Sequence, residues 1–365
     1  MKVAVFARGL SHRPTGRGVY AAEMIRALAG DPSLQLDVFA AEPVDLPGCR
    51  FWPARGRTPV GSAWRVLHGI GRDLRTLQPD VLWSATHFLP RGLPPGLPTV
   101  ATLLDAVWRD HPETMSRGRR WAAGWVEEGL RRADRIVCIS HFTRDRLAAH
   151  WPELLPRAEV IHLAPNPRLQ TLPAEPALLA RLGLDRPFVV TVGTLEPRKN
   201  FGLVLDAMRL VPGVMLLHCG PAGWNMERLS ERARRSPDVR LLGWVDEPTL
   251  AALYRAAVAA VFPSIYEGFD LPALDAASLG CPLVVSDIPV HREILGEAPL
   301  YCPPDSPELL AEHIRSLRDS EAERRARSRQ LAERAAQFEW RRSAAQLTRL
   351  FRNASKGNKK RSFGP

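Results

Sequence analysis

Short runs of apolar residues alternate with segments of helical periodicity along the whole chain. In the first half, apolar runs predict buried strands at 3–7, 36–40, 80–83, 99–104, 135–139 and 159–163. Between them, apolar positions three or four residues apart predict helices at 18–28, 63–77, 119–132 and 142–150. This alternation predicts a parallel sheet covered by helices.

The second half repeats the same order of elements. Apolar runs predict strands at 188–192, 214–218, 239–242, 258–262, 283–286 and 300–302, and a helical pattern follows each of them. Between the halves, residues 164–187 contain five prolines and little periodicity, which is typical of a hinge. We therefore expect an α/β protein of two Rossmann-like, doubly wound domains facing each other across a cleft, with ligands beyond the carboxyl ends of the strands.

The length of 365 residues agrees with two domains. We predict a first domain at 1–168, a second at 169–340, and a C-terminal helix at 341–352 that packs back on the first domain. Residues 353–365 contain four basic residues and no acid, so we predict a disordered basic tail there.

Other patterns in the sequence indicate the cellular compartment of the protein. No apolar run reaches the roughly 18 residues of a membrane-spanning helix, and the start of the chain has the pattern of a buried strand leading into Gly9 rather than of a signal peptide. The five cysteines are odd in number and scattered, without the spacing of a zinc site. These observations predict free thiols and a cytoplasmic protein.

The net charge of +11 comes mostly from arginine and is larger in the first half. A predicted helix carries Arg117, Arg119 and Arg120 beside Trp121 and Trp125. One interpretation is a peripheral patch for the anionic inner face of a membrane or for a phosphorylated lipid acceptor. The alternative is a solvated arginine face with both tryptophans packed inward. Nucleic acid is not favoured, because no helix-turn-helix, zinc finger or aromatic RNA-binding signature occurs.

The most informative stretch runs from Pro263 to Asp275, between a predicted strand and a predicted helix. Pro272 falls in the first turn of that helix, where proline is tolerated, and Asp270 occupies the capping position. A strand, a short turn and a helix N-terminus form an anion site, because unpaired amides and the helix dipole point into the turn. Glu267 and Asp275 lie on either side of this turn.

A second stretch, Gly193 to Asn200, also links a strand to a helix. Gly193 permits a sharp turn, and Arg198 and Lys199 place a bidentate donor and a point charge where a phosphate could bind. The alternative is an exposed basic turn capped by Asn200.

The sequence also contains the pattern GxGxxA, beginning at Gly16 and Gly18. This pattern occurs in dinucleotide-binding sites. Here, however, the preceding strand ends near Ala7, and Asp37 opens the next strand instead of ending it. A nicotinamide-dependent oxidoreductase is therefore not favoured.

The stretch that starts at Pro263 matches PSxYEGFxLPxLxAxxxGxPxVxSD and resembles the signature of the family 4 retaining glycosyltransferases of the GT-B fold, including bacterial mannosyltransferases. The resemblance implies that the first domain binds the acceptor and the second the nucleotide sugar. The family has two glutamates eight positions apart, and this chain has Glu267 and Asp275 there. Asp270 replaces a glycine usual in the family, beside the expected sugar and diphosphate.

The resemblance also implies roles for individual residues. The catalytic residues would be Arg198 and Lys199, which hold the leaving diphosphate, and Glu267, which bonds the donor sugar. The donor-binding residues would be Gly16, Gly18, Gly193, Asp270, Leu271 and, on the ribose, Asp275. Many relatives have a His-Asp pair where this chain has Leu104 and Asp105. His87 or His111 could approach the same space, although histidines in such positions are more often structural.

The resemblance implies a retaining transferase that moves a hexose, expected to be mannose, to a saccharide or lipid-linked acceptor of surface polysaccharide or lipopolysaccharide. No Asp-x-Asp occurs, which agrees with a metal-free mechanism without cofactors. Two alternatives stay open: a degenerate relative that binds a nucleotide or partner without catalysis, and a nucleotide-sugar epimerase.

Overall fold

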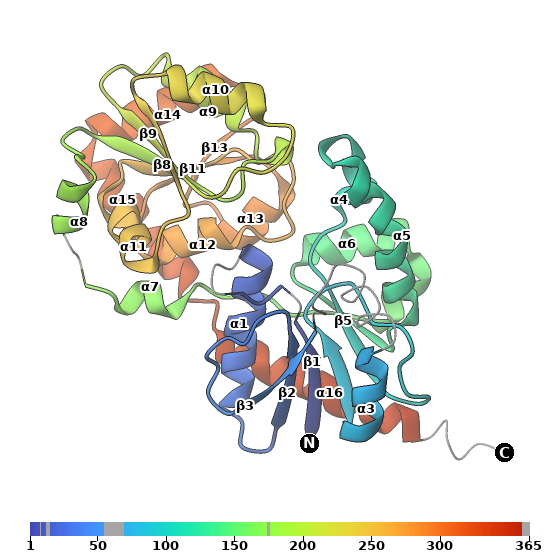
Figure 1. Cartoon of the computed structure of the whole chain (residues 1–365). Coiled ribbons are helices and arrows are strands. Elements are labelled where there is room, and N and C mark those ends of the chain that lie inside the picture. Colours follow the sequence, from blue (N-terminus) through green and yellow to red (C-terminus); the bar gives the residue numbers. More distant parts are fainter. Residues whose placement is uncertain (8, 12–14, 55–68, 174–175, 360–365) are drawn as a thin grey trace. The chain divides into compact units, whose positions relative to one another are not determined.

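A computed structural model describes residues 1–7, 9–11, 15–54, 69–173 and 176–359. It divides into two compact units, each with a parallel sheet of its own (Figure 1). The N-terminal unit comprises Met1–Arg109, Arg117–Leu163 and the chain from Glu339 onward. The C-terminal unit comprises Asp110–Ser116 and Ala164–Phe338.

The sheet of the N-terminal unit has the strand order β3-β2-β1-β4-β5-β6-β7, and all pairs are parallel. Its strands are β1 (Lys2–Phe6), β2 (Gln35–Ala40), β3 (Cys49–Pro53), β4 (Val81–Ser84), β5 (Thr99–Leu103), β6 (Arg135–Cys138) and β7 (Ala158–Val160). The helices of this part of the chain are α1 (Gly16–Ala29), α3 (Ile70–Leu77), α4 (Val107–Asp110), α5 (Arg117–Arg132), α6 (His141–His150), the 3-10 helix η3 (Pro152–Arg157) and α16 (Trp340–Lys359).

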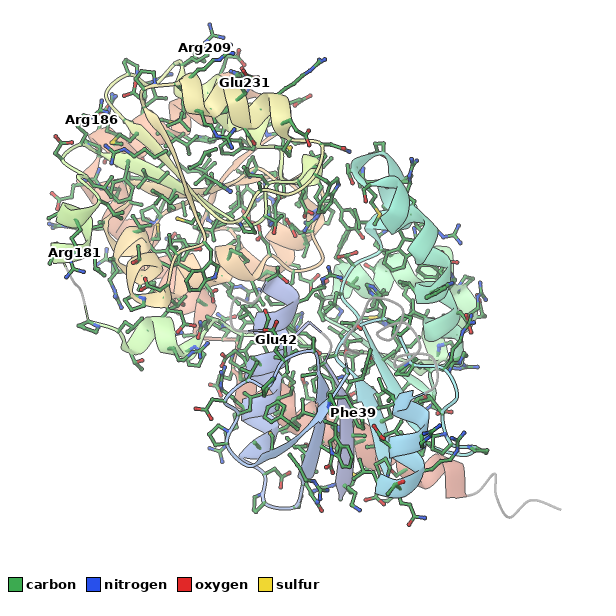
Figure 2. All side chains as sticks on the ribbon, in the orientation of Figure 1. Phe39, Glu42, Arg181, Arg186, Arg209 and Glu231 are labelled. Carbon is green, nitrogen blue, oxygen red and sulfur yellow. The ribbon has the colours of Figure 1, made fainter. Side chains whose placement is uncertain are left out.

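The edge strand β3 has no counterpart among the predicted strands. Its residues are mostly half-buried, so the sequence lacks the continuous apolar run that marks the inner strands. Trp52 of β3 stacks on the buried Phe39 of β2, with ring centroids 5.8 Å apart. Phe39 is labelled in Figure 2. Of the helix predicted at 63–77, residues 70–77 are helical, and residues 63–68 lie outside the described residues.

Helix α16 packs against α1 and the strands β4 and β5 of the N-terminal unit. Phe351 lies fully buried beside Trp83, and Trp340 beside Tyr20. The helix continues to Lys359, so the prediction of a disordered tail is wrong for residues 353–359. Ala354 is buried and the Ser355 hydroxyl donates to the Asp80 carbonyl, which extends the packed face beyond the predicted end. Residues 360–365 lie outside the described residues.

The sheet of the C-terminal unit is also parallel throughout, in the order β10-β9-β8-β11-β12-β13. Its strands are β8 (Phe188–Val192), β9 (Met215–Cys219), β10 (Val239–Gly243), β11 (Ala259–Phe262), β12 (Leu283–Ser286) and β13 (Leu300–Cys302). Its helices are η2 (Pro112–Thr114), α7 (Pro167–Thr171), α8 (Pro176–Arg181), η4 (Pro197–Lys199), α9 (Phe201–Met208), α10 (Glu227–Arg235), α11 (Glu247–Ala256), α12 (Leu271–Ser278), α13 (Pro289–Leu295), α14 (Pro307–Asp319) and α15 (Glu321–Ala335).

The prediction of two parallel-sheet α/β domains is confirmed by these two sheets. In the C-terminal unit, apolar side chains of β8, β9, β11, α9 and α14 share one core, so both helices are anchored to the sheet. Figure 1 shows α9, α10 and α14 close to one another and apart from α12 and α13. The core thereby fixes the carboxyl ends of the strands and the loops that leave them.

Among the described residues, no helix is both long enough and apolar enough to span a membrane. The five cysteines are free thiols. Trp125 is 37% exposed, so the interpretation that both tryptophans of α5 pack inward is wrong for Trp125. The side chain of Trp121 lies outside the described residues, and contact with an anionic membrane stays a prediction.

Candidate functional site

The two chemically informative stretches of the second half meet at the carboxyl ends of β8 and β11. These strands are adjacent, and the order of the sheet reverses between them, because β9 follows β8 outward on one side and β12 follows β11 on the other. Ligands of open α/β sheets bind at such a point. A backbone hydrogen bond of 2.9 Å from Ile265 to Arg198 joins the two loops.

Glu267 lies at the centre of this site and contacts two cations. Its two carboxylate oxygens lie 2.6 Å from Arg198 Nη1 and 2.6 Å from Lys199 Nζ, and its side chain is buried. Burial opposes ionisation, but the guanidinium and the ammonium outweigh it and lower the pKa of Glu267 to about 2. Glu267 is therefore an anion at neutral pH and fixes both cations.

Arg198 is held on several sides. Besides Glu267, it pairs with Glu196 at 2.5 Å and donates to the carbonyl of Tyr266 at 3.1 Å. A planar guanidinium with several fixed partners presents its remaining face in one orientation. The alternative of an exposed basic turn is therefore wrong for Arg198, whose side chain is only 20% exposed.

Lys199 also lies among carboxylates, with its side chain 16% exposed. Its ammonium lies 3.4 Å from Asp270 Oδ1 in addition to its contact with Glu267. Burial lowers the pKa of an ammonium, yet Asp270 and Glu267 together raise the pKa of Lys199 above its ordinary value. An ammonium has three N–H donors, so one donor is available to a ligand.

Asp270 does not act as the helix cap that the sequence predicts. It occupies the capping position of α12, but its side chain makes no capping hydrogen bond. The reason is its left-handed backbone, with φ of 67°, which directs the carboxylate to Lys199 and His291. His291, on α13, is fully buried and was not among the predicted site residues. Leu271 follows as the first residue of α12, where a ligand could meet the helix N-terminus.

Asp275 lies on the second turn of α12 and is 8% exposed. One of its oxygens accepts a 2.7 Å hydrogen bond from the backbone N–H of Asn166. The Asn166 side chain in turn donates to Glu247 on α11. Asp275 thus ties α12 to the start of α7, and its predicted contact with a ribose stays a prediction.

Gly193 shapes the loop that carries the two cations. Its φ of 137° is accessible to glycine, and a Cβ there would lie 3.4 Å from Lys199 Cε. The next loop presses against it, because a Cβ on Gly220 would fall 1.9 Å from the Gly193 carbonyl oxygen. The two glycines let the loops after β8 and β9 pack backbone to backbone.

A second histidine of this unit was also missed. His218, at the end of β9, is buried and contacts the Thr191 hydroxyl through Nδ1 at 2.9 Å. Burial, with a contribution from the nearby Lys199 ammonium, lowers the pKa of His218 to about 4, so the ring is neutral at pH 7. Its ring lines a small cavity of about 20 Å³ together with Ser264. No pattern in the sequence distinguishes His218 from other strand residues.

The remaining predicted residues lie in the N-terminal unit. Gly16 is the first residue of α1, and Gly18 is buried in its first turn, so the pattern GxGxxA forms part of a helix rather than a free loop. The His87 ring packs edge-on against Trp108, and burial lowers its pKa to about 4. Asp105 accepts from the backbone of Val107 at 3.3 Å. Their predicted contacts with donor or acceptor stay predictions.

His111 belongs to the C-terminal unit. Its ring centroid lies 5.4 Å from that of Tyr266, inside the Glu267 motif, and its Nδ1 lies 3.0 Å from Glu113. Of the two histidines considered from the sequence, His111 is the one in the same unit as Glu267.

Asp37 has a structural role. Its carboxylate is fully buried and accepts from Arg50 at 2.6 and 3.0 Å and from the Trp52 indole at 2.9 Å. These contacts fasten β3 to β2. The carboxylate is engaged by its own sheet, which argues against a nicotinamide ribose at this position.

The chemistry of the site suits a phosphate. Glu267 and Asp270 are engaged by cationic side chains, so these carboxylates orient Arg198 and Lys199 instead of presenting an open cage to a metal ion. Two fixed cations beside a helix N-terminus stabilise negative charge that develops on a bound phosphate.

Comparison with known proteins gave matches along both halves. Residues 180–337 match the family model Glycosyl transferases group 1, and residues 14–167 match Glycosyltransferase Family 4. O-antigen chain mannosyltransferase B of Escherichia coli is 31% identical over 305 residues, which cover 80% of this chain and 79% of that protein.

Two solved structures have the same fold. Sucrose-phosphate synthase from Thermosynechococcus elongatus matches with a TM-score of 0.79 at 20% identity, covering 97% of this chain and 98% of that one. Anabaena Alr3699/HepE in complex with UDP-glucose matches with a TM-score of 0.77 at 16% identity, covering 97% of this chain and 100% of that one.

Proposed function

Because the chain belongs to the glycosyl transferases of group 1 and family 4, we propose that it transfers a hexose from a nucleotide diphosphate sugar to an acceptor hydroxyl. The family predicted from the Glu267 motif is confirmed, and the chain is a glycosyltransferase of the GT-B fold. The donor, the acceptor and the stereochemistry belong to the proposal.

The observation that carries the proposal is the arrangement of Arg198, Lys199 and Glu267 at the reversal point of the sheet. When the bond between sugar and diphosphate breaks, negative charge grows on the leaving phosphate. Arg198 and the third N–H of Lys199 are held in place to receive that charge, and the first amides of α12 add to them. Because their positions are fixed before the reaction, little reorganisation is needed as the charge develops.

We further propose that the reaction retains the configuration of the sugar and uses these side chains in place of a divalent metal. Glu267 would then hydrogen-bond the sugar, Asp275 the ribose, and the leaving phosphate would take the proton of the acceptor. Mannose is the proposed sugar, and a saccharide or lipid-linked acceptor of surface polysaccharide the proposed acceptor. The E. coli relative, named as an O-antigen chain mannosyltransferase, supports both.

The test is a panel of nucleotide sugars, including GDP-mannose and UDP-glucose, incubated with mannose-terminated acceptors in the presence of EDTA. Product NMR reports the anomeric configuration, and chromatography reports the released nucleotide. We expect one donor to be consumed only with an acceptor, and Lys199→Ala to abolish the reaction while Lys356→Ala, on the exposed end of α16, does not.

Other outcomes would replace the proposal. Conversion of a donor without an acceptor would indicate an epimerase. Tight nucleotide binding with no turnover of any donor would indicate a non-catalytic relative. Loss of activity in EDTA that added Mg²⁺ restores would overturn the metal-free mechanism.

A further inference from the structure

Asp270 and His291 form a fully buried pair beside the two cations of the site. Asp270 Oδ2 lies 3.1 Å from His291 Nε2, and Asp270 Oδ1 lies 3.4 Å from Lys199 Nζ. His291 has no part in the function proposed above. The hydrogen bonds around its ring nevertheless determine how many protons this pair holds.

The hydrogen of the Ser286 hydroxyl is used in a hydrogen bond to another group and is not available to His291. This hydroxyl donates to the backbone carbonyl of Ser264, and a carbonyl oxygen can only accept. The other ring nitrogen of His291, Nδ1, lies 2.9 Å from the Ser286 carbonyl and 3.2 Å from the Ser286 hydroxyl oxygen. Neither oxygen has a hydrogen to offer, so Nδ1 must carry one and donate it.

A neutral imidazole with its hydrogen on Nδ1 has only a lone pair on Nε2. An ionised carboxylate oxygen is also an acceptor, and two acceptors do not approach to 3.1 Å in a buried site without a proton between them. We infer that Asp270 and His291 together hold one proton, as imidazolium and aspartate or as imidazole and aspartic acid. In either form the pair is electrically neutral, and His291 is a positioning residue that keeps the Lys199 ammonium from being cancelled by Asp270.

The backbone at Asp270 supports a dedicated role for its carboxylate. Its φ of 67° is strained for a residue with a Cβ and would suit glycine better. The Asp270 side chain makes no capping hydrogen bond that could stabilise this conformation, so its contacts with Lys199 and His291 hold it there.

The other charged side chains near His291 have ionic partners. Arg292 pairs with Glu297 as well as with Asp287, and Arg198 pairs with Glu196 as well as with Glu267. Asp287, which precedes α13, and Arg292 form a bidentate pair at 2.8 and 2.9 Å. Glu267, beyond Lys199, is paired with Arg198. The Tyr301 hydroxyl donates to the His291 carbonyl at 3.2 Å. Asp270 is the fully buried acid that contacts His291 directly, so the proton on this pair decides how much of the charge of Asp270 is compensated.

The consequence for the enzyme rests on the proposed function. Loss of the shared proton leaves a buried carboxylate 3.4 Å from the ammonium that receives the leaving diphosphate. That carboxylate attracts the ammonium away from the ligand and repels the phosphate. Binding of an anionic donor should therefore require the proton.

The proton itself can be observed without any substrate. We would record ¹⁵N-histidine NMR spectra of the full-length, ligand-free enzyme at pH 7 and assign His291 by the signal lost in His291→Gln. The expected result is a protonated Nδ1, with Nε2 either protonated or accepting a proton from Asp270. A ring whose hydrogen is on Nε2 alone, with Nδ1 unprotonated, would overturn the inference.

The role of the pair is tested by a double-mutant cycle. His291→Gln should raise the donor KM by about tenfold or more, because it leaves the charge of Asp270 uncompensated. Asp270→Asn combined with His291→Gln should recover most of that loss. If the double variant is as weak as His291→Gln, the histidine acts only by packing and the inference is wrong.

The same variants distinguish a folding defect from a loss of function. Thermal unfolding identifies a variant that fails to fold, and Asp270→Gly, which suits the left-handed backbone, replaces Asp270→Asn in that case. If wild type neither binds nor uses any nucleotide sugar, the proposed function fails, whereas the NMR result on the proton still stands or falls by itself.

Discussion

A methyl group at Gly220 would collide with the loop that carries Arg198 and Lys199. Its Cβ would fall 1.9 Å from the Gly193 carbonyl oxygen, whereas real Cβ atoms essentially never approach another heavy atom within 3.0 Å. The two loops would therefore have to separate by at least about 1 Å. A displacement of that size at a catalytic group costs about a hundredfold in rate. We predict that Gly220→Ala lowers kcat/KM by about that factor.

Variants at two other glycines distinguish the effect of the steric clash from the effect of backbone strain. Gly223 does not need a left-handed backbone, but its Cβ would lie 2.0 Å from the Leu195 carbonyl oxygen. Gly213 has φ of 80° with no atom within 4 Å, and it lies before β9, at the end of the strand away from the site. Gly223→Ala should therefore lose activity, and Gly213→Ala should keep it while losing about 1–2 kcal/mol of stability.

The assay combines initial rates of sugar transfer with denaturant unfolding of each variant. Gly220 also has a φ of 149°, so Gly220→Ala should be the least stable of the three. Equal activity of Gly220→Ala, Gly223→Ala and Gly213→Ala would refute the argument, because it would mean that the loop tolerates the displacement or does not position the cations.

Three further predictions concern stability. The pKa of Glu267 is about 2 in the fold against 4.5 ordinarily, so its charge stabilises the protein above pH 4.5 and this contribution is lost as the pH falls toward 2. In Glu267→Gln the free energy of unfolding should therefore fall less steeply between pH 4.5 and pH 2 than in wild type, and an unchanged dependence on pH would contradict this. Asp37→Ala should lower the free energy of unfolding, measured with denaturant, by about 2 kcal/mol or more, because it leaves Arg50 and the Trp52 indole without their acceptor. A negligible loss of stability would show that these hydrogen bonds do not hold β3. Ending the chain after Arg352 removes buried Ala354 and the hydrogen bond from Ser355, so it should lower the free energy of unfolding by about 1–2 kcal/mol. Ending it after Lys356 should change the stability little. Equal melting temperatures of the two truncated proteins would contradict the packing of this turn.

The fold and the chemical centre of the site were predictable because both depend on local patterns. Buried parallel strands appear as continuous apolar runs, so the inner strands of both sheets could be read from the sequence. Arg198, Lys199 and Glu267 lie in the loops that follow such strands, and the carboxyl ends of adjacent parallel strands meet at one edge of a sheet. Their proximity therefore followed from the order of the elements.

The features that were missed depend on contacts between distant segments. His291 reaches Asp270 from another helix, 21 residues away, and the left-handed backbone of Asp270 could not be read from a residue type that is a common helix cap. Asp275 bonds the backbone of Asn166, 109 residues away. The last turn of α16 continues because Ala354 and Ser355 find partners in the N-terminal unit, although the local composition favours disorder.

The most direct test of the donor site is a thermal-shift series with UDP, GDP, ADP and CDP on wild type, Lys199→Ala and the surface control Lys356→Ala. A ligand at 100 times its dissociation constant stabilises the folded protein by about 2.7 kcal/mol, which gives a readable shift. We predict that one nucleoside diphosphate raises the melting temperature of wild type and of Lys356→Ala, and that Lys199→Ala loses most of the shift. If no nucleotide stabilises wild type, or if Lys199→Ala responds as wild type does, the cations at the ends of β8 and β11 do not form the donor site.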